Sequence, residues 1–577
     1  MPRSPSSALA LAGRLRSLDD GQLGDLLRAR EVSPAGIRDF FDLAERLLSR
    51  ESVQACLARL DRPTLLSLST GAIDLSSLAL TDQDGAPYDT VAATLEGWPA
   101  IGLPSAAELA EPAPPALAPV SSTDTHFTDH AAAERAFATT SAAMEVLGEL
   151  WHAPARELVR GGLSLPDAKR LSGSAGVALD DLGALLAVCA AAGLATLVGS
   201  EWQPGEASVR WREGGAVRRW ALLASSWFAG LPADIRSLLS GRSHAMWGEP
   251  LAEYVRWLYP ASADHMHARM AVQLRSAEML GIVVDAVPST PGSAVLSGDT
   301  EAATAAMGAL FPAEVDKVYV QHDLTIVSPG PLEATLDSRL RELADVESSG
   351  LATTYRVSAG SINRAVSAGD TADSLRAFVA SISLTGIPQP LDYLIEETAR
   401  RHGLVRVGRM AGGSYVRSSD SDTLAAIAVD HALSSIGLHR TPQGLESRFD
   451  EELVFWALSD ARYPVSLEDS SGSILTVHRR RAAPVTTSVV DTTRELIERL
   501  RLSSADDTET GWLERQLESA VKARTAVVVT VNLPSGPTEF VLEPTGIGGG
   551  RLRARDRASD IERTLPLSSI LEVHPAD

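Results

Sequence analysis

The chain has 577 residues, of which 45% are apolar and 22% charged, and this is the composition of a folded protein with several domains. Its 74 acidic and 52 basic residues give a net charge of −22, which excludes attraction of nucleic acid by bulk charge and requires a local basic patch for any such contact. The two cysteines, Cys56 and Cys189, exclude a disulfide framework and a cysteine-rich zinc site and favour a reducing cytoplasm.

Residues 1–103 are predicted to form a helical N-terminal region. Apolar residues recur at spacings of three and four in three successive stretches, as expected for helices that each bury one face. Cys56 falls in the third stretch and is expected to be a core thiol. Residues 104–128 follow as a Pro- and Ala-rich linker, a composition that favours an extended chain.

Residues 129–222 are predicted to form a winged-helix-like domain. After a short capped helix, a second helix is expected from Leu179 to Ala192, and strands are expected at Leu194–Val198 and Ala207–Arg212. Helix, turn, helix, strand, wing and strand is the order of a winged-helix module.

The second predicted helix of this domain argues against DNA reading. It carries Asp180 and Asp181 and no basic residue, so it lacks the side chains that contact base edges and phosphates. We therefore expect a structural or protein-contact role. The uncharged stretch Leu182–Val198 is too short and too weakly apolar for a membrane span, so a buried helix, a turn and a strand are expected there.

A similar order recurs in residues 223–312, which are predicted to be a second helical, winged-helix-like domain. A helix ends before Gly281, and strands are expected at Ile282–Val287 and Ser293–Leu296.

Residues 313–410 are predicted to be an α/β domain, and they carry a local basic excess. The segment 351–410 holds seven arginines and five acidic residues, a net charge of +2. Six arginines are selected here as candidate nucleic-acid-binding residues: Arg356, Arg364, Arg400, Arg401, Arg406 and Arg409. The alternative for Arg400 and Arg401 is that they only complement the dipole at the end of a helix.

The stretch 317–409 resembles the N-terminal domain of XPB-type DNA helicases. The resemblance lies in the order and spacing of short motifs, namely Val320-Gln321-His322-Asp323, Tyr355-Arg356-Val357-Ser358, Ser361 with Ala365 and Gly369, Pro388-Gln389-Pro390, and Arg401-His402-Gly403-Leu404-Val405-Arg406. The surrounding chain is similar to helicase-associated proteins of high-GC Gram-positive (actinobacterial) bacteria that carry this domain without motor domains. The resemblance implies an accessory role linked to DNA repair.

The sequence lacks the motif of an ATP-driven motor. A P-loop needs a lysine followed by Ser or Thr, whereas Lys169, Lys317 and Lys522 precede Arg, Val and Ala. No nucleophile elbow, zinc-protease pair or dinucleotide fingerprint occurs either. We therefore expect a non-catalytic protein without a metal or cofactor.

The last third is predicted to contain an α/β region over 411–484, a helical connector over 485–524 and a small β-barrel over 525–577. The run His478-Arg479-Arg480-Arg481 is expected to be a solvated strand end.

Within the predicted barrel, arginine alternates with Leu and Ala, so that Arg551, Arg553 and Arg555 share one strand face. This face either binds an anion or is only the exposed side of a half-buried strand. The barrel is similar to the WYL-type domain, an SH3-like barrel of bacterial regulators, although Arg551-Leu552-Arg553 stands near the place of the Trp-Tyr-Leu signature.

These patterns predict an α+β multi-domain protein with a helical N-terminal region, winged-helix-like modules, an XPB-type α/β domain and a C-terminal SH3-like β-barrel. The expected function is that of a cytoplasmic, non-catalytic accessory protein that contacts DNA through its arginines, partners a separately encoded XPB-type helicase and does not contact membranes. The alternatives are a WYL-type transcription regulator with a winged helix, and a protein-interaction scaffold.

Overall fold

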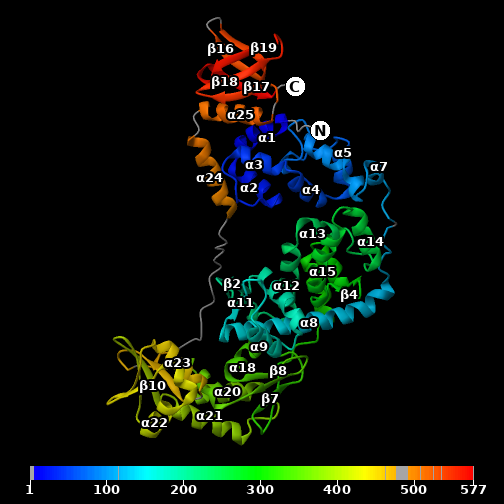
Figure 1. Ribbon diagram of the computed structural model, residues 1–577. Coiled ribbons are helices and arrows are strands. Elements are labelled where there is room, and N and C mark those ends of the chain that lie inside the picture. Colours follow the sequence, from blue (N-terminus) through cyan, green and yellow to red (C-terminus); the bar gives the residue numbers. More distant parts are fainter. Residues whose placement is uncertain are drawn as a thin grey trace. The chain divides into compact units, whose positions relative to one another are not determined.

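The computed structural model describes residues 5–114, 116–461, 463–472, 474–475, 492–506, 509–523, 525–533 and 536–575. The chain is mixed α/β with several sheets, and it divides into two compact units (Figure 1). Unit 1 consists of Met1–Ala116, Glu249–Arg269 and Thr487–Asp577, and unit 2 of Leu117–Gly248 and Met270–Thr486. The predicted α+β, multi-domain class is confirmed at this level.

The N-terminal region of unit 1 is helical, as predicted. Its helices and short 3-10 turns are α1 (Pro5–Ser17), α2 (Asp20–Ala29), α3 (Phe40–Leu47), α4 (Arg50–Ala58), α5 (Arg62–Ser69), η1 (Ser76–Leu78), α6 (Asp89–Glu96), η2 (Trp98–Ile101) and α7 (Ala106–Leu109), and α14 (Glu249–Leu258) also belongs to this unit. Side-chain caps begin successive helices, from Asp19 at α2 to Asp61 at α5. Cys56 is buried in the core, as predicted.

This helical core is completed by a segment from the other end of the chain. Leu496, Ile497 and Leu500 of α24 (Thr492–Asp506) belong to the same buried cluster as the leucines of α1 to α4. The predicted helical connector therefore supplies core residues to the N-terminal region.

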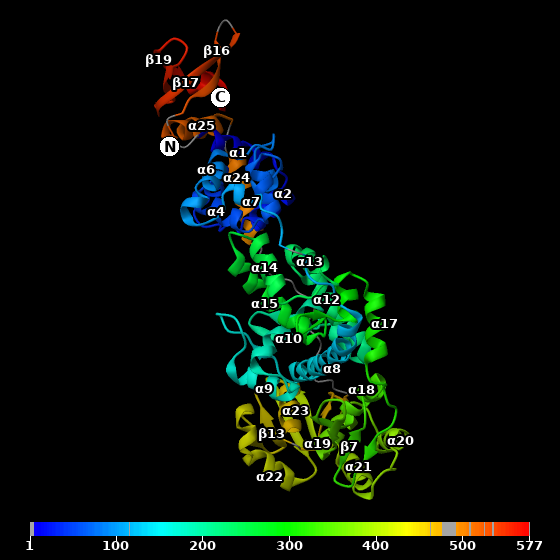
Figure 2. The same ribbon diagram turned by 90° about the vertical axis from the view of Figure 1, so that its right-hand side faces the viewer.

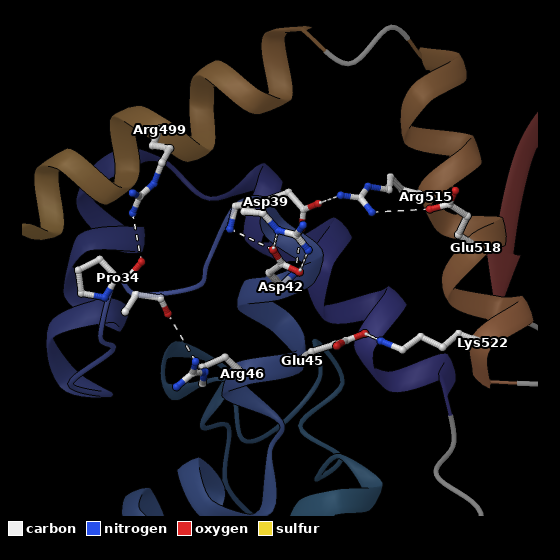
Figure 3. A network of polar contacts seen from close by, with 11 residues as sticks. Pro34, Asp39, Asp42, Glu45, Arg46, Arg499, Arg515, Glu518 and Lys522 are labelled. Carbon is white, nitrogen blue, oxygen red and sulfur yellow. Dashed lines mark hydrogen bonds and ion pairs between the residues drawn. The ribbon is translucent and has the colours of Figure 1, made fainter.

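Polar contacts of α24 and of α25 (Glu509–Ala523) reinforce this packing (Figure 3). Arg499 donates to the carbonyl oxygen of Pro34 at 3.3 Å, and Lys522 lies 3.5 Å from a carboxylate oxygen of Glu45. Arg515 forms an ion pair of 2.8 Å with Asp39, the residue that also caps α3.

The C-terminal residues form a five-stranded antiparallel sheet. Its strands are β16 (Val527–Leu533), β17 (Gly536–Gly548), β18 (Arg551–Asp556), β19 (Ile561–Pro566) and β20 (Ile570–Pro575). The strand order is β19-β18-β17-β16-β20, and within the described residues no pairing joins β19 to β20. The expected closed SH3-like barrel is therefore not observed. Leu517 and Ala520 of α25 join the core of the sheet, so a helix covers its apolar face and closure is not needed to bury it.

In unit 2 the long helix α8 (Ser122–His152) is the central element (Figure 2). It packs against α9 (Leu165–Ala175), α10 (Leu179–Ala191), α12 (Ala216–Gly230), α16 (Thr290–Leu296) and α17 (Thr300–Leu310). Because α8 begins at Ser122, the last residues of the predicted linker 104–128 are helical.

The predicted winged-helix-like domain, residues 129–222, contains the expected helix, turn, helix and first strand. The second strand is observed, but not where it was predicted. A three-stranded sheet has the order β1-β3-β2, formed by β1 (Ala155–Arg156), β2 (Ala195–Val198) and β3 (Glu201–Pro204). Gly199 adopts a φ of +64°, which permits a tight hairpin, so β3 begins within the predicted loop. The predicted strand Ala207–Arg212 is instead the helix α11 (Ala207–Glu213).

The second predicted winged-helix-like domain, residues 223–312, is only partly observed. Helix α15 (Ala263–Met279) leads to the two-stranded ribbon β4 (Val283–Val284) and β5 (Val287–Pro288). The predicted strand Ser293–Leu296 lies in α16, because Ser289 caps that helix by accepting from the Gly292 amide. Helix α13 (Ala233–Ser240) precedes α15 in the chain.

The predicted α/β domain contains the expected strands and helices. A four-stranded sheet has the order β6-β7-β9-β8, with β6 (Tyr319–Val320), β7 (Thr325–Ser328), β8 (Asp345–Ser348) and β9 (Thr353–Arg356). Its helices are α18 (Ala334–Leu343), α19 (Ala359–Ser367), α20 (Ala372–Ile382) and α21 (Gln389–Arg401). Buried residues of the sheet and helices, including Ile326, Tyr355 and Ile395, form one core.

A six-stranded sheet follows, in the order β12-β13-β11-β10-β14-β15. Its elements are β10 (Val405–Met410), β11 (Gly413–Ser418), α22 (Ser421–Val429), η3 (His431–Ile436), β12 (His439–Thr441), β13 (Gly444–Ser447), α23 (Glu451–Asp460), β14 (Val465–Glu468) and β15 (Ile474–Leu475). The boundary expected at residue 410 falls at the turn of the β10–β11 hairpin. The basic run 478–481 lies outside the described residues.

No single helix in the described ranges is long and apolar enough to cross a membrane. By length and composition alone, only α9 and α10 pass that test together, as a pair bent by 83°. The expected structure of Leu182–Val198 is confirmed, because Gly193 separates the partly buried helix α10 from the strand β2.

Candidate nucleic-acid interface

The end of helix α21 carries two exposed arginines that share one carboxylate. Arg400 and Arg401 each lie 2.6 Å from an oxygen of Glu397, with side-chain exposures of 70% and 61%. A hydrogen bond from Arg400, supported by the charges of both arginines, holds the pKa of Glu397 below its usual value. Two cations against one anion leave one positive charge in excess at this helix end.

The adjacent hairpin repeats this arrangement around a buried acid. Arg406 on β10 lies opposite Arg417 on β11, and their guanidinium groups are 3.3 and 2.5 Å from Glu468 on β14. The side chain of Glu468 is fully buried and also accepts a hydrogen bond of 2.9 Å from the Tyr415 hydroxyl. Burial would raise the pKa of Glu468, but hydrogen bonds from Arg417, Tyr415 and Arg406 outweigh it and lower the pKa, so the carboxylate stays charged.

We call Arg400, Arg401, Arg406 and Arg417 the α21–β11 arginine cluster. Its four guanidinium groups share two carboxylates in the ion pairs that they form. In the pairs at the end of α21 the guanidinium groups are the exposed partners, so Arg400 and Arg401 remain accessible to an anion from solvent while they contact Glu397. Arg406 is held on the buried Glu468 and has a structural role in addition.

The other three candidate arginines of this region are neutralised one to one. Arg356 on β9 pairs with Glu347 at 2.8 Å, and Arg409 on β10 pairs with Glu451 at 2.7 Å. Arg364 on α19 pairs with Asp345. The structure therefore brings only part of the predicted set together with an excess of positive charge.

A second candidate surface lies on β18, in the C-terminal sheet. Arg551, Arg553 and Arg555 are exposed and alternate with buried residues, which places them on one face as predicted. Arg555 pairs with Asp560 at 2.6 Å, whereas Arg551 and Arg553 have no ion pair within the described part of the chain.

The neighbours of Arg551 and Arg553 leave this face open. On β17 they lie opposite Gly548 and Gly546, and a Cβ built on either glycine would meet no atom within 4 Å. A ligand can therefore approach the backbone of β17 closely beside two uncompensated guanidinium groups. We call this surface the β18 arginine face.

The acidic helix α10 contributes no cation to either surface, in agreement with the sequence. Instead, Arg275 of α15 donates to the carbonyl oxygen of Asp180 at 3.1 Å and lies 3.8 Å from the carboxylate of Asp181. One of the two carboxylates at the start of α10 is therefore paired from another helix.

Arg417 was not among the predicted residues. The signal that could have found it is the Gly412-Gly413 pair, because a tight turn there sets the register that places Arg417 opposite Arg406.

Residues 318–442 match a family model described as "Helicase conserved C-terminal domain". The matched stretch contains the four-stranded sheet, continues through the β10–β11 hairpin and ends just after β12. It includes the whole α21–β11 arginine cluster but not the β18 arginine face. This match indicates a helicase-related role. A search among curated proteins found no match.

Proposed function

We propose that this chain is a non-catalytic, cytoplasmic accessory protein that binds DNA and partners a separately encoded XPB-type helicase in DNA repair or processing. The observation that carries the proposal is the helicase-type match over residues 318–442 in a chain whose lysines form no P-loop. In this proposal the motor acts in trans, and the chain contributes binding and positioning.

DNA contact runs through the two arginine surfaces. Guanidinium groups bind phosphate oxygens in a bidentate geometry, and their charge does not depend on pH in the physiological range. The β18 arginine face offers two cations without an ion pair to any described residue. The α21–β11 cluster offers the exposed Arg400 and Arg401, which share the half-buried carboxylate of Glu397. A local excess of positive charge of this kind supports DNA binding even though the whole chain has a net charge of −22.

The experiment is a salt-dependent titration of the full chain on single-stranded, forked and duplex DNA, read by fluorescence anisotropy. Each phosphate contact that is lost reduces the slope of log K against log salt by about 0.7–0.9. We expect the double substitution Arg551→Ala with Arg553→Ala to reduce the slope by about 1.4–1.8. The double substitution Arg400→Ala with Arg401→Ala should reduce it by a smaller amount, because these residues share Glu397.

Arg38→Ala is the matched control in unit 1, because Arg38 is exposed, pairs with Asp42 and belongs to neither surface. Its slope should equal that of the unchanged chain. Binding that does not respond to salt, or equal losses in the control and the double variants, would contradict the proposed contacts. ATP hydrolysis by the purified chain would contradict the assignment of the motor to a partner.

A further inference from the structure

Unit 2 contains a groove between two consecutive helices that neither arginine surface includes. Helices α11 and α12 are joined by Gly214 and Gly215, and the groove beside them has a volume of about 640 Å³. Its lining includes Glu206, Arg210, Trp211, Arg218, Arg219 and Leu222. This is the stretch predicted in part as a strand, so its arginines are brought together only by the helical fold.

The groove has an excess of positive charge. Its lining holds three arginines and one glutamate, a net charge of +2, and Glu314 lies beside it, where it accepts from the Ala216 amide at 3.1 Å. Arg210 and Arg218 are exposed, and neither has an ion pair with any residue that the structure describes. They differ in this respect from all six predicted arginines of the α/β domain, each of which contacts a carboxylate.

Arg219 adds a buried cation at the wall of the groove. Its side chain is 9% exposed, it donates to the carbonyl oxygen of Arg212, and its guanidinium lies 5.8 Å from the centroid of the Trp211 ring. Its Nε is buried and has no hydrogen-bond partner among the described residues. Burial lowers the pKa of Arg219, although the nearby charges of Asp337 and Glu314 act in the opposite direction.

A buried guanidinium without a paired carboxylate is costly, because buried charges are normally neutralised and hydrogen-bonded. An anionic ligand in the groove supplies the acceptor that the Nε of Arg219 lacks among the described residues. The groove is open, and three of its lining residues are arginines, the side chain best suited to bidentate contacts with phosphate.

We propose that the α11–α12 groove binds the phosphodiester backbone of a DNA strand, with Arg210 and Arg218 contacting phosphate groups and Arg219 completing the site. This inference rests on the proposed function and adds a third contact surface to it. It places DNA contact directly after the β2–β3 hairpin, and not on the acidic helix α10.

The test is the same salt-dependent titration on forked and duplex DNA, applied to the full chain with Arg210→Gln and Arg218→Gln combined. Both residues are exposed, so the variant should keep the melting temperature of the unchanged chain. We expect the slope of log K against log salt to fall by about 1.4–1.8 and the affinity at moderate salt to fall by at least tenfold. Arg275→Gln is the matched control in the same unit, because Arg275 is exposed and pairs with Asp181.

A second variant tests the buried cation. Arg219→Met preserves length and packing while removing the charge, and it should weaken DNA binding without reducing thermal stability. Loss of stability with unchanged DNA binding would show that Arg219 is only structural and would overturn its role in the site.

The outcomes separate this inference from the proposed function. If the groove variant binds DNA as the unchanged chain does while the β18 double variant loses affinity, the groove proposal is wrong and the proposed function stands. Equal losses in the groove variant and in Arg275→Gln would reduce the effect to overall charge and also overturn the groove. If the unchanged chain binds no DNA, both proposals fall.

Discussion

Arg341 on α18 forms a paired contact with Glu145 on α8, a residue 196 positions earlier in the chain, at 2.9 and 3.2 Å. Arg341 also contacts Asp337 at 2.9 Å, and Asp337 accepts a hydrogen bond of 2.6 Å from the Tyr355 hydroxyl. Burial and the charge of Asp337 raise the pKa of Tyr355, so the hydroxyl remains a donor. This buried network joins the helicase-matching stretch to the central helix of unit 2.

Replacing Arg341 with Met should therefore destabilise unit 2 strongly. Removal of one partner from a buried ion pair leaves uncompensated charges, which typically costs about 3–5 kcal/mol. The measurement is urea denaturation followed by circular dichroism. Arg275→Met is the control, because Arg275 and its partner Asp181 are both largely exposed, so a loss of about 1 kcal/mol or less is expected. Equal losses in the two variants would contradict the proposed role of the network.

Leu500→Ala should destabilise unit 1 by about 2–5 kcal/mol, because Leu500 is fully buried in the N-terminal helical core. Leu502→Ala, two residues further along α24, is the matched control, since that side chain is 68% exposed. Thermal unfolding of both variants checks the prediction. If Leu500→Ala melts like the control, α24 does not complete the core.

The two cysteines should not react with Ellman's reagent at pH 8 in the folded chain, and both should react after denaturation. Both thiols are buried, and burial raises the pKa of Cys189 to about 12. Because folding favours the protonated thiol, its contribution to stability is complete below pH 9 and is lost as the pH rises toward 12. Rapid labelling of Cys189 at pH 8 would contradict this burial.

Asp556 should make the C-terminal sheet sensitive to acid. Hydrogen bonds from Ser559 and Arg563 lower the pKa of Asp556 to about 2. The folded state therefore favours the ionised carboxylate, and this stabilisation is present above pH 3.8 and is lost as the pH falls toward 2. In Asp556→Asn the free energy of unfolding should vary less between pH 4 and pH 2, as measured by chemical denaturation at each pH. An unchanged pH dependence would contradict the prediction.

Helices and strands were predicted correctly where a single local pattern of apolar residues determines them. The N-terminal helices follow from apolar residues at spacings of three and four, and the exposed positions of Arg551 and Arg553 follow from strict alternation along β18. The stretch 207–212 was predicted wrongly, because the tight turn at Gly199 moved the second strand of the hairpin forward and left those residues to form α11.

The contacts of each arginine could not be predicted in the same way. Glu468 neutralises Arg406 from β14, and Glu451 neutralises Arg409 from α23, both more than 40 positions further along the chain. A count of charges within a sequence window misses such partners, because sheet pairing brings them together. The role of α24 was missed for the same reason, since its partners lie in the first hundred residues.

The closing of the N-terminal core by α24 has a consequence during synthesis. Helices α1 to α5 leave the ribosome roughly 430 residues before Leu496 and Leu500 are made. At about 5–20 residues per second, the nascent chain carries an incomplete hydrophobic core for about 20–90 s. Premature termination upstream of α24 therefore yields a product whose first helices lack the three apolar side chains with which α24 covers their core, and such fragments are natural clients for chaperones and proteases.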